Sequence, residues 1–351
     1  MAEVNRVAVL KLLGGLPTKP PWPSGRCIFR VPSTIRRHNE YVYDPQLVSI
    51  GPYHHGHERL QHMEKFKRWY LRCLLDRTPN PECNLSRLFE VIKSNAQYCL
   101  DCYSEMEEDT IIDIDKFIVM VILDGCFVIE LFRKQAGVLP RHPDDPIFTT
   151  SYMRKILLSD LMLLENQLPW FVLEVLFDLT SSHQERGNTS IAGESSEMMD
   201  VRFDKGVMRI PPIVILDNAE SLIRNLIAYE QCDGTCKDKI TSYAVLLNNL
   251  IQSGTDLDYL REKGIVECFL SSKEIHVFFR SLYNDVDLVY YTYASMSRDI
   301  DRYCRSHLPR WRALLLTDYF SNPWSILSFI AALLLLLLSF LQTLFSIRFA
   351  C

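Results

Sequence analysis

The chain has 351 residues, of which 48% are hydrophobic and 23% are charged, so it can bury a sizeable core and is not a wholly disordered chain. Its 38 lysines and arginines stand against 43 acidic residues, a formal net charge of −5, which excludes a globally basic surface for nucleic acid. We therefore expect no nucleic acid among its partners.

The first segment, residues 1–26, ends in the proline-rich run PTKPPWPSG and predicts an extended leader. Its apolar stretch is brief and is interrupted by Lys11, which is too short for a secretory signal. We expect regular structure to begin at Cys27.

Residues 27–180 read as the first helical part of the body. Apolar residues at helical spacing predict an amphipathic helix over 61–76. The nearly all-apolar segment 117–132 is too short and too acidic for a membrane span, and predicts a buried helix. Residues 151–179 predict a further helical region, bent or interrupted at Pro169. The polar segment 181–200 indicates a linker or exposed loop.

Residues 201–320 read as the second helical part. The segment 207–216 carries two prolines and suits an extended edge. Further helices are expected over 218–231 and 238–253. A turn of helix should begin at the capping pattern Thr255-x-x-Asp258, and a capping box, Ser271-x-x-Glu274, should open a helix through Tyr283. A long polar helix should then run from about Val286 towards the C-terminus. The fold class is mainly α, with few short extended segments.

The extreme C-terminus carries the clearest physical signal. Residues 326–347 contain no charge, and at about 1.5 Å per residue a helix of this length spans roughly 33 Å, enough for a bilayer core of about 30 Å. We predict a transmembrane helix over 325–347 and a short tail over 348–351, with the lipid bilayer as a partner. The residues that mark this anchor are Trp324 at one interface, Ile326, the leucine run Leu333 to Leu338, Ile347, and Arg348 at the other interface.

Charges upstream of the span predict its orientation. The positive-inside rule places the flank rich in arginine on the cytosolic side, with the tail across the membrane. We therefore expect a single-pass protein of the plasma membrane or an endomembrane, with a cytosolic body. The arginines concerned are Arg298, Arg302, Arg305, Arg310 and Arg312.

The 11 cysteines are an odd number at irregular spacing, which in a cytosolic body favours reduced thiols. The Cys99/Cys102 and Cys232/Cys236 pairs could together ligate zinc, but their separation favours small buried thiols. Sequons at Asn84 and Asn188 become meaningful only if the topology is inverted.

The run PYHHGH brings three imidazoles together, His54, His55 and His57, and such a group can bind zinc or copper. The alternative is that Gly51 and Gly56 form turns and the histidines cap or pack there, and we favour it. We expect no cofactor.

Four acids lie inside apolar segments: Asp124, Glu130, Asp160 and Glu165. Their spacing along each helix places the members of each pair on different faces, so neither pair forms a catalytic dyad by itself. Glu130 and Lys134 are interpreted as a surface pair. Asp124 and Glu165 are expected to form salt bridges with arginines of the opening segment and to fix how it docks, the candidates being Arg30, Arg36 and Arg37.

Tyrosines gather on the segment that leads to the membrane, and tyrosine is favoured at protein interfaces. Packing on the body explains them equally well, and both interpretations remain open. They are Tyr283, Tyr290, Tyr291, Tyr293 and Tyr303.

Five blocks of the chain resemble the plant-specific family of domain of unknown function 247, also described as uncharacterised protein family 0481. They are IFRVPSTIRRHNEYVYDPQLVSIGPYHHGHERLQHMEKFKRWYL (28–71), LDGCFVIELF (123–132), DLMLLENQLPWFVLE (160–174), NLIAYEQC (225–232) and NPW (322–324). The region between Leu179 and Met208 is shorter than the resemblance leads us to expect. The positions that carry the structural signature are Pro32, Gly51, Pro52, Tyr53, Asp124, Glu130, Glu165, Asn166, Asn225, Tyr229 and Glu230.

The resemblance implies a helical body, one C-terminal membrane pass and no assigned enzymatic activity; some members are implicated in grass self-incompatibility, which suggests recognition or signalling. The chain also lacks the common nucleophile, phosphate-loop and zinc-hydrolase motifs. We therefore predict a non-enzymatic, membrane-anchored protein-interaction module. The alternative is a membrane-tethered, metal-dependent enzyme that uses His54, His55 and His57.

Overall fold

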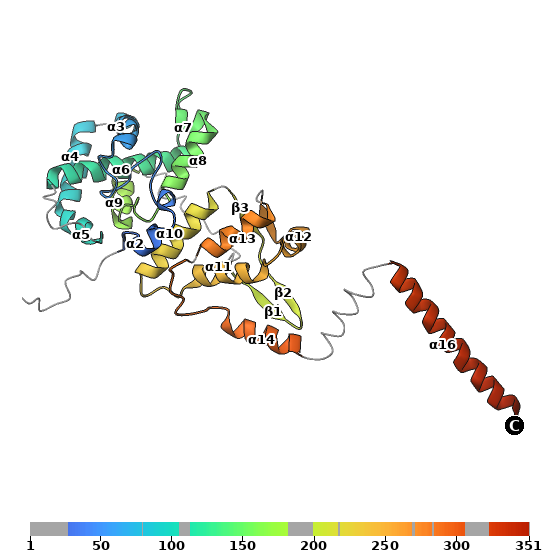
Figure 1. The fold of residues 1–351 in the computed structure, drawn as a ribbon. Coiled ribbons are helices and arrows are strands. Elements are labelled where there is room, and N and C mark those ends of the chain that lie inside the picture. The colour runs from blue at the N-terminus through green and yellow to red at the C-terminus, as the bar shows by residue number, and fades with distance from the viewer. Residues whose placement is uncertain are drawn as a thin grey trace, which may run out of the picture. The chain divides into compact units, whose positions relative to one another are not determined.

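The structure is a computed structural model and confirms the mainly α fold (Figure 1). It describes residues 27–78, 80–104, 113–181, 199–216, 218–268, 271–282, 284–305 and 323–350. The leader predicted at 1–26 and most of the linker predicted at 181–200 lie outside these ranges, so both stay predictions.

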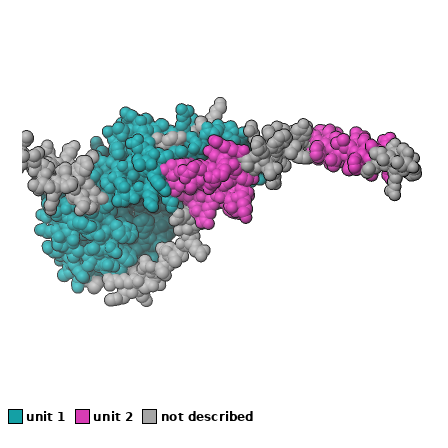
Figure 2. All heavy atoms as spheres, turned by 90° about the horizontal axis from the view of Figure 1, so that it is seen from below, with its two compact units in different colours: residues 1–195, 213–290 teal, residues 196–212, 291–351 magenta. Residues whose placement is uncertain are grey.

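The chain forms two compact units, each assembled from two separate stretches of sequence (Figure 2). Unit 1 comprises residues 1–195 and 213–290, and unit 2 comprises residues 196–212 and 291–351. Each unit is described by itself below.

Helix α6 (Ile114–Gln135) is the centre of unit 1, and α3, α4 and α9 pack around it (Figure 1). Most of its side chains are buried, as expected for a helix that is apolar on nearly every face. At Gly125 a Cβ atom would collide with Leu176, so the glycine lets α9 approach closely. The surrounding helices are α3 (Gln61–Asp76), α4 (Pro81–Ser94), α5 (Ala96–Asp101), α7 (Pro146–Thr149), α8 (Ser151–Asp160) and α9 (Trp170–Thr180).

The opening segment, which we define as residues 27–60, contains very little regular structure. Only three short elements occur in it: α2 (Ser33–Arg36) and the 3₁₀ turns η1 (Glu40–Val42) and η2 (Glu58–Leu60). One parallel bridge pairs Ile28 with Tyr103. Its backbone therefore depends on side chains for many of its hydrogen bonds.

The helical region predicted over 151–179 is interrupted by more than a bend. Helix α8 ends at Asp160 and α9 begins at Trp170, and the intervening residues form turns and extended backbone. Pro169 immediately precedes α9 and has extended backbone geometry, with φ −55° and ψ 132°, so the connection ends there. We call residues 161–169 the α8–α9 connection.

The rest of unit 1 is a second helical group with a two-stranded parallel ladder, in which Ile213 pairs with Val266 and Ile215 with Cys268. Its elements are β3 (Ile213–Ile215), α10 (Ala219–Cys232), α11 (Lys239–Leu250), α12 (Gly254–Glu262), β4 (Val266–Cys268) and α13 (Ser272–Ser281).

Two capping predictions in this group have different outcomes. The capping box of Ser271 and Glu274 at the start of α13 is confirmed. The cap predicted at Thr255 is wrong, because Ser253 caps α12 and forms a capping box with Asp256. The shift of two residues follows from the backbone: Ser253 has the extended φ and ψ of a cap, and Thr255 is already helical.

Unit 2 contains the antiparallel hairpin of β1 (Arg202–Asp204) and β2 (Val207–Arg209), and helix α14 (Ala294–Arg305). Tyr303 of α14 packs edge to face against Phe203, with ring centroids 5.8 Å apart. The predicted start of the long helix at about Val286 is wrong, because α14 starts at Ala294, eight residues later. Tyr290, Tyr291 and Tyr293 precede it, and Tyr283 is outside the described residues.

Helix α16 (Pro323–Ala350) carries the predicted anchor, including Trp324, Ile326, Leu333, Leu338, Ile347 and Arg348. Residues Trp324–Thr343 have a mean hydropathy of 2.5 with none of the window buried, so by length and composition this helix can cross a membrane.

Candidate functional site

An apolar groove in unit 1, with a cavity volume of about 480 Å³, is the candidate site. The α8–α9 connection supplies more of its lining residues than any other element, and α6, α9, α10 and the opening segment supply the rest. It is lined by Cys27, Ile28, Ile50, Val128, Phe132, Leu161, Met162, Leu163, Leu164, Asn166, Gln167, Leu168, Trp170, Leu173, Asn225, Leu226 and Tyr229.

Three large apolar side chains at the groove are exposed to solvent. Trp170 is 76% exposed, and Met162 and Phe132 are each 51% exposed. They come from the start of α9, the α8–α9 connection and α6. Exposed tryptophan and methionine beside a hollow are typical of a binding surface, because burying them against a partner removes much apolar area from water.

The polar side chains that line the groove are engaged inside the body. The amide groups of Asn166, Gln167 and Asn225 donate to backbone carbonyl oxygens at 2.8–3.0 Å. The Tyr229 hydroxyl donates to Asp233 at 2.9 Å. The groove therefore presents mainly apolar surface.

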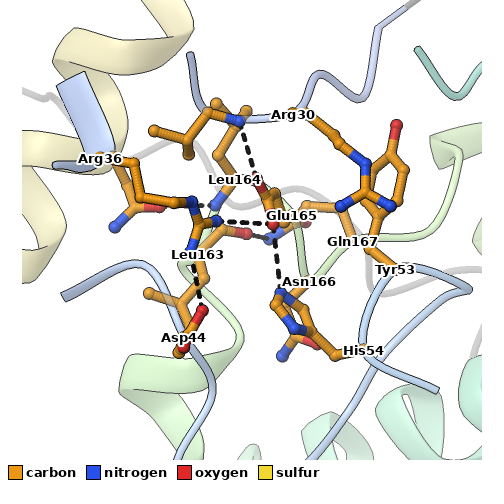
Figure 3. Close-up of polar contacts among 12 residues, drawn as sticks. Arg30, Arg36, Asp44, Tyr53, His54, Leu163, Leu164, Glu165, Asn166 and Gln167 are labelled. Carbon is orange, nitrogen blue, oxygen red and sulfur yellow. Dashed lines mark hydrogen bonds and ion pairs between the residues drawn. The ribbon is translucent and has the colours of Figure 1, made fainter. Parts of the chain in front are cut away.

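Glu165, between the groove-lining residues Leu164 and Asn166, holds the opening segment (Figure 3). Its carboxylate accepts the Val31 N–H at 2.7 Å and the Arg36 guanidinium at 2.7 Å, and the His54 Nε2 atom lies 3.4 Å away. Burial alone would raise the pKa of Glu165, but these partners together outweigh burial and lower the pKa to about 2. The expected salt bridge of Glu165 with Arg36 is present.

Asp160 and Asn166 complete the attachment of the opening segment. Asp160 accepts the N–H groups of Gln46, Leu47 and Val48 at 2.6–2.9 Å. The Asn166 side chain accepts the Ile50 N–H at 2.6 Å and donates to the Val48 carbonyl at 3.0 Å. Burial raises the pKa of Asp160, and the three N–H donors oppose that effect. These side chains replace the ladder that the irregular backbone lacks.

Asp124 has a different partner from the one predicted. It lies 2.6 Å from the Lys67 ammonium and accepts the Gly51 N–H at 2.9 Å, and no ion pair with Arg30 or Arg37 forms among the described residues. Sequence spacing placed Lys67 on the amphipathic helix α3, but the lysine faces α6 and is completely buried. Burial raises the pKa of Asp124 and the Lys67 charge opposes it.

The interpretation of Glu130 and Lys134 as a surface pair is wrong. Both side chains are buried, because they lie on faces of α6 that are covered by neighbouring parts of unit 1. Glu130 pairs with Arg77 of the chain after α3 at 2.5 Å, and Lys134 pairs with Asp145 at 3.2 Å.

The three histidines differ in burial, although the His54 and His57 rings lie edge to face with centroids 5.7 Å apart. His54 is buried beside Glu165, whereas His55 and His57 are exposed on the turn around Gly56. Among the described residues no group of three histidine, cysteine, aspartate or glutamate side chains could hold a metal ion, and this covers the Cys99/Cys102 and Cys232/Cys236 pairs. The residues proposed for a metal-dependent enzyme are therefore not assembled into a site.

The remaining signature residues also make internal contacts. Pro32 precedes α2, and Pro52 lies in the turn after Gly51. The Tyr53 hydroxyl donates to the Ile28 carbonyl at 3.2 Å, beneath Arg30. Asn225 accepts the Leu164 N–H at 2.9 Å, and Glu230 accepts the first N–H groups of α11 from Ile240 and Thr241 at 2.7 and 2.9 Å.

Sequence reasoning missed the groove rim of Phe132, Met162 and Trp170. A signal was present in the α8–α9 connection, where methionine and tryptophan flank a helix interruption instead of continuing an apolar stripe. Which of these apolar residues stay exposed depends on neighbours that are distant in sequence.

Comparisons with known proteins give a consistent result. A family model, DUF247, described as a plant protein of unknown function, matches residues 28–197 and 188–338. The UPF0481 protein At3g47200 of Arabidopsis thaliana is 26% identical over 412 aligned residues, covering 90% of this chain and 85% of that protein. The putative UPF0481 protein At3g02645 of the same plant is 34% identical over 145 residues, covering 40% of this chain and 27% of that protein. No solved structure matches the chain.

Proposed function

Since the chain belongs to the DUF247 family of plant proteins of unknown function, we propose that it is a non-enzymatic, single-pass membrane protein whose body binds another protein through the apolar groove. The observation that carries the proposal is the groove itself, with Trp170 76% exposed at its rim. Every signature acid described above is engaged in holding the fold, whereas the exposed apolar side chains of the groove remain accessible to a partner.

The expected occupant is the apolar face of an amphipathic helix from the partner protein. The amide groups that line the groove donate to the body's own carbonyl oxygens, so an extended peptide would find few polar groups with which to pair its backbone. A helix satisfies its own backbone hydrogen bonds and needs only apolar contact.

The membrane part of the proposal rests on α16. Its apolar window of 20 residues is long enough for the bilayer core, and Arg298, Arg302 and Arg305 precede it in α14. The positive-inside rule then favours a cytosolic body with the C-terminus across the membrane.

Site-specific photo-crosslinking tests the groove. A photoreactive amino acid at position 162 or 170 of the full chain in plant membranes should give one discrete adduct with a second protein. The same amino acid at position 152, where Tyr152 is 71% exposed on α8 outside the groove, is the control.

Fragment mapping should place the crosslink on an amphipathic helix of the adducted protein. Trp170→Ala should weaken binding of that protein at least tenfold, whereas Tyr152→Ala should not. A crosslink to lipid only, a self-adduct, or equal adducts from position 152 would contradict the proposal.

Protease protection on intact membranes tests the orientation, with a tag at each end of the chain. Digestion of the body with survival of the C-terminal tag is the expected result. Protection of the body would reverse the orientation and would direct the search for partners to the other side of the membrane.

A further inference from the structure

Two cysteines far apart in the sequence lie directly beside each other at the start of the opening segment. The Cys27 N–H donates to the Cys102 carbonyl at 3.1 Å, and the Ile28 N–H donates to the same oxygen at 3.0 Å. The Ser104 N–H returns a bond to the Ile28 carbonyl at 2.9 Å. The segment after α5 is therefore held tightly against the first described residues.

The register places the two side chains together. Ile28 and Tyr103 form a parallel bridge, so the residues one position earlier, Cys27 and Cys102, are also neighbours across it. Neighbouring strands lie about 4.8 Å apart, and side chains at paired positions point to the same face. A disulfide needs Cα atoms about 4.4–6.8 Å apart, and the usual spacing of paired strands lies within that range.

From this geometry we infer that Cys27 and Cys102 form a redox couple, a dithiol that closes to an intramolecular disulfide when the chain meets an oxidant of the disulfide class. Both cysteines are free thiols in the structure. Cys27 is exposed and Cys102 is buried, so the oxidant reaches Cys27 first and Cys102 is the resolving thiol.

The reaction with glutathione disulfide balances in two exchange steps. The Cys27 thiolate attacks one sulfur of glutathione disulfide, which forms a mixed disulfide and releases one glutathione thiolate. The Cys102 thiolate then attacks the Cys27 sulfur and releases the second glutathione. Two electrons and two protons pass from the two cysteines to the oxidant, which leaves as two molecules of glutathione.

The second exchange is slowed by the high pKa of the attacking Cys102 thiol. Burial raises the pKa of the Cys102 thiol to about 12, and contact with Cys27 adds to that effect. Closure should consequently be slower than the first attack and should accelerate as pH rises.

Cys99 is the competing partner for Cys102, because the two form a C-x-x-C pair at the end of α5. Cys99 is completely buried, so an oxidant in solution has no direct access to it. Cys27 is therefore favoured over Cys99 as the partner of Cys102, both because it is exposed to the oxidant and because it is the neighbour of Cys102 across the bridge. Formation of the bond would tie the start of the opening segment to α5 across the intervening helices α3 and α4.

The test uses the purified full chain in detergent, equilibrated with glutathione buffers from fully reduced to fully oxidised and then alkylated. Non-reducing peptide mapping should show a Cys27–Cys102 link as the main intramolecular disulfide. The oxidised chain should melt about 5–10 °C above the reduced chain, since the cross-link restricts the unfolded state. Cys83→Ser, which removes another exposed thiol, should keep both results.

Two variants separate the steps. Cys102→Ser should stop at the mixed disulfide, with one glutathione on Cys27 and no gain in melting temperature. Cys27→Ser should leave Cys102 reduced. A Cys99–Cys102 link, a wild-type chain that stops at glutathionylated Cys27, or disulfides scattered among the exposed thiols would overturn the inference. None of these readouts depends on a binding partner or on membrane orientation, so the outcome is separate from that of the groove.

Discussion

The Glu165 carboxylate accepts the backbone N–H of Val31 at 2.7 Å, across 134 positions of sequence. A side chain of the α8–α9 connection thus holds backbone of the opening segment, and the same carboxylate also binds Arg36. The connection has two roles: its buried acid and amide groups hold the opening segment, and its apolar residues line the groove.

Replacement of Glu165 by glutamine should lower the free energy of unfolding by an amount that depends on pH. The carboxyl has a pKa of about 2 in the fold, compared with about 4.3 in an unfolded chain, so it stabilises the fold by about 3 kcal/mol above pH 5. Because the folded pKa is the lower one, this contribution is complete above the unfolded value and is lost as pH falls from about 4 towards 2. We expect Glu165→Gln to lower the free energy of unfolding by about 2–4 kcal/mol at pH 7 and by much less at pH 3.

Urea unfolding of wild type and variant between pH 3 and pH 7 measures this effect. The difference between the two proteins isolates Glu165 from Asp124 and Asp160, whose raised pKa values contribute with the opposite sign. Glu174→Gln, at an exposed position of α9, is the control and should leave the profile unchanged. A pH-independent difference for Glu165→Gln would show that its charge is not what stabilises the opening segment.

Gly51 should tolerate no side chain. Its φ of +75° is unfavourable for other residues, and a Cβ atom would collide with the Gln167 backbone carbonyl. We expect Gly51→Ala to cost about 2–5 kcal/mol, the sum of backbone strain and the collision. Gly56→Ala is a matched control, since its φ is +86° with no atom within 4 Å of the added carbon, and it should cost only about 1 kcal/mol. Equal losses of melting temperature would argue that the close approach of Gly51 to the α8–α9 connection is unimportant.

The buried pair of Lys67 and Asp124 should be costly to break from either side. Lys67→Met leaves the buried Asp124 without its charged partner, and we expect a loss of about 3–5 kcal/mol. Asp124→Asn leaves Lys67 with Glu64, 2.5 Å away, as its remaining carboxylate, and should cost less. The double variant should lose clearly less than the sum of the two, because it removes both charges of the Lys67–Asp124 pair together. Asp76→Asn breaks the exposed pair of Arg72 and Asp76 and should cost less than about 1 kcal/mol. Chemical denaturation of all four variants gives the coupling energy, and a value near zero would contradict the pairing.

Helix α12 should depend on Ser253 instead of Thr255. The Ser253 side chain accepts the Asp256 N–H at 3.3 Å, and Asp256 accepts the Ser253 N–H at 2.8 Å. We expect Ser253→Ala to destabilise the chain by about 0.5–2 kcal/mol and Thr255→Ala to have an effect of a few tenths. Amide hydrogen exchange over residues 254–262 locates the change, and a larger effect from Thr255→Ala would restore the cap predicted from sequence.

Local sequence pattern predicted α3 over 61–76 and the buried helix α6 because the spacing of apolar residues is a property of each segment alone. The same reasoning placed the capping box at Ser271. It failed at Thr255, where two overlapping capping patterns compete and only the backbone conformation of Ser253 distinguishes them.

By itself the sequence determined the family, the mainly helical fold and an apolar C-terminal helix long enough to cross a membrane. Those properties depend on residue order and on runs of neighbouring side chains. Only the tertiary structure decided that Lys67 is a partner of Asp124, that Glu130 is buried, that His54 alone of the three histidines is buried and that Cys27 meets Cys102. Each of these relations joins segments that are distant in sequence, and which distant segments meet is set by the packing of whole helices rather than by any local pattern.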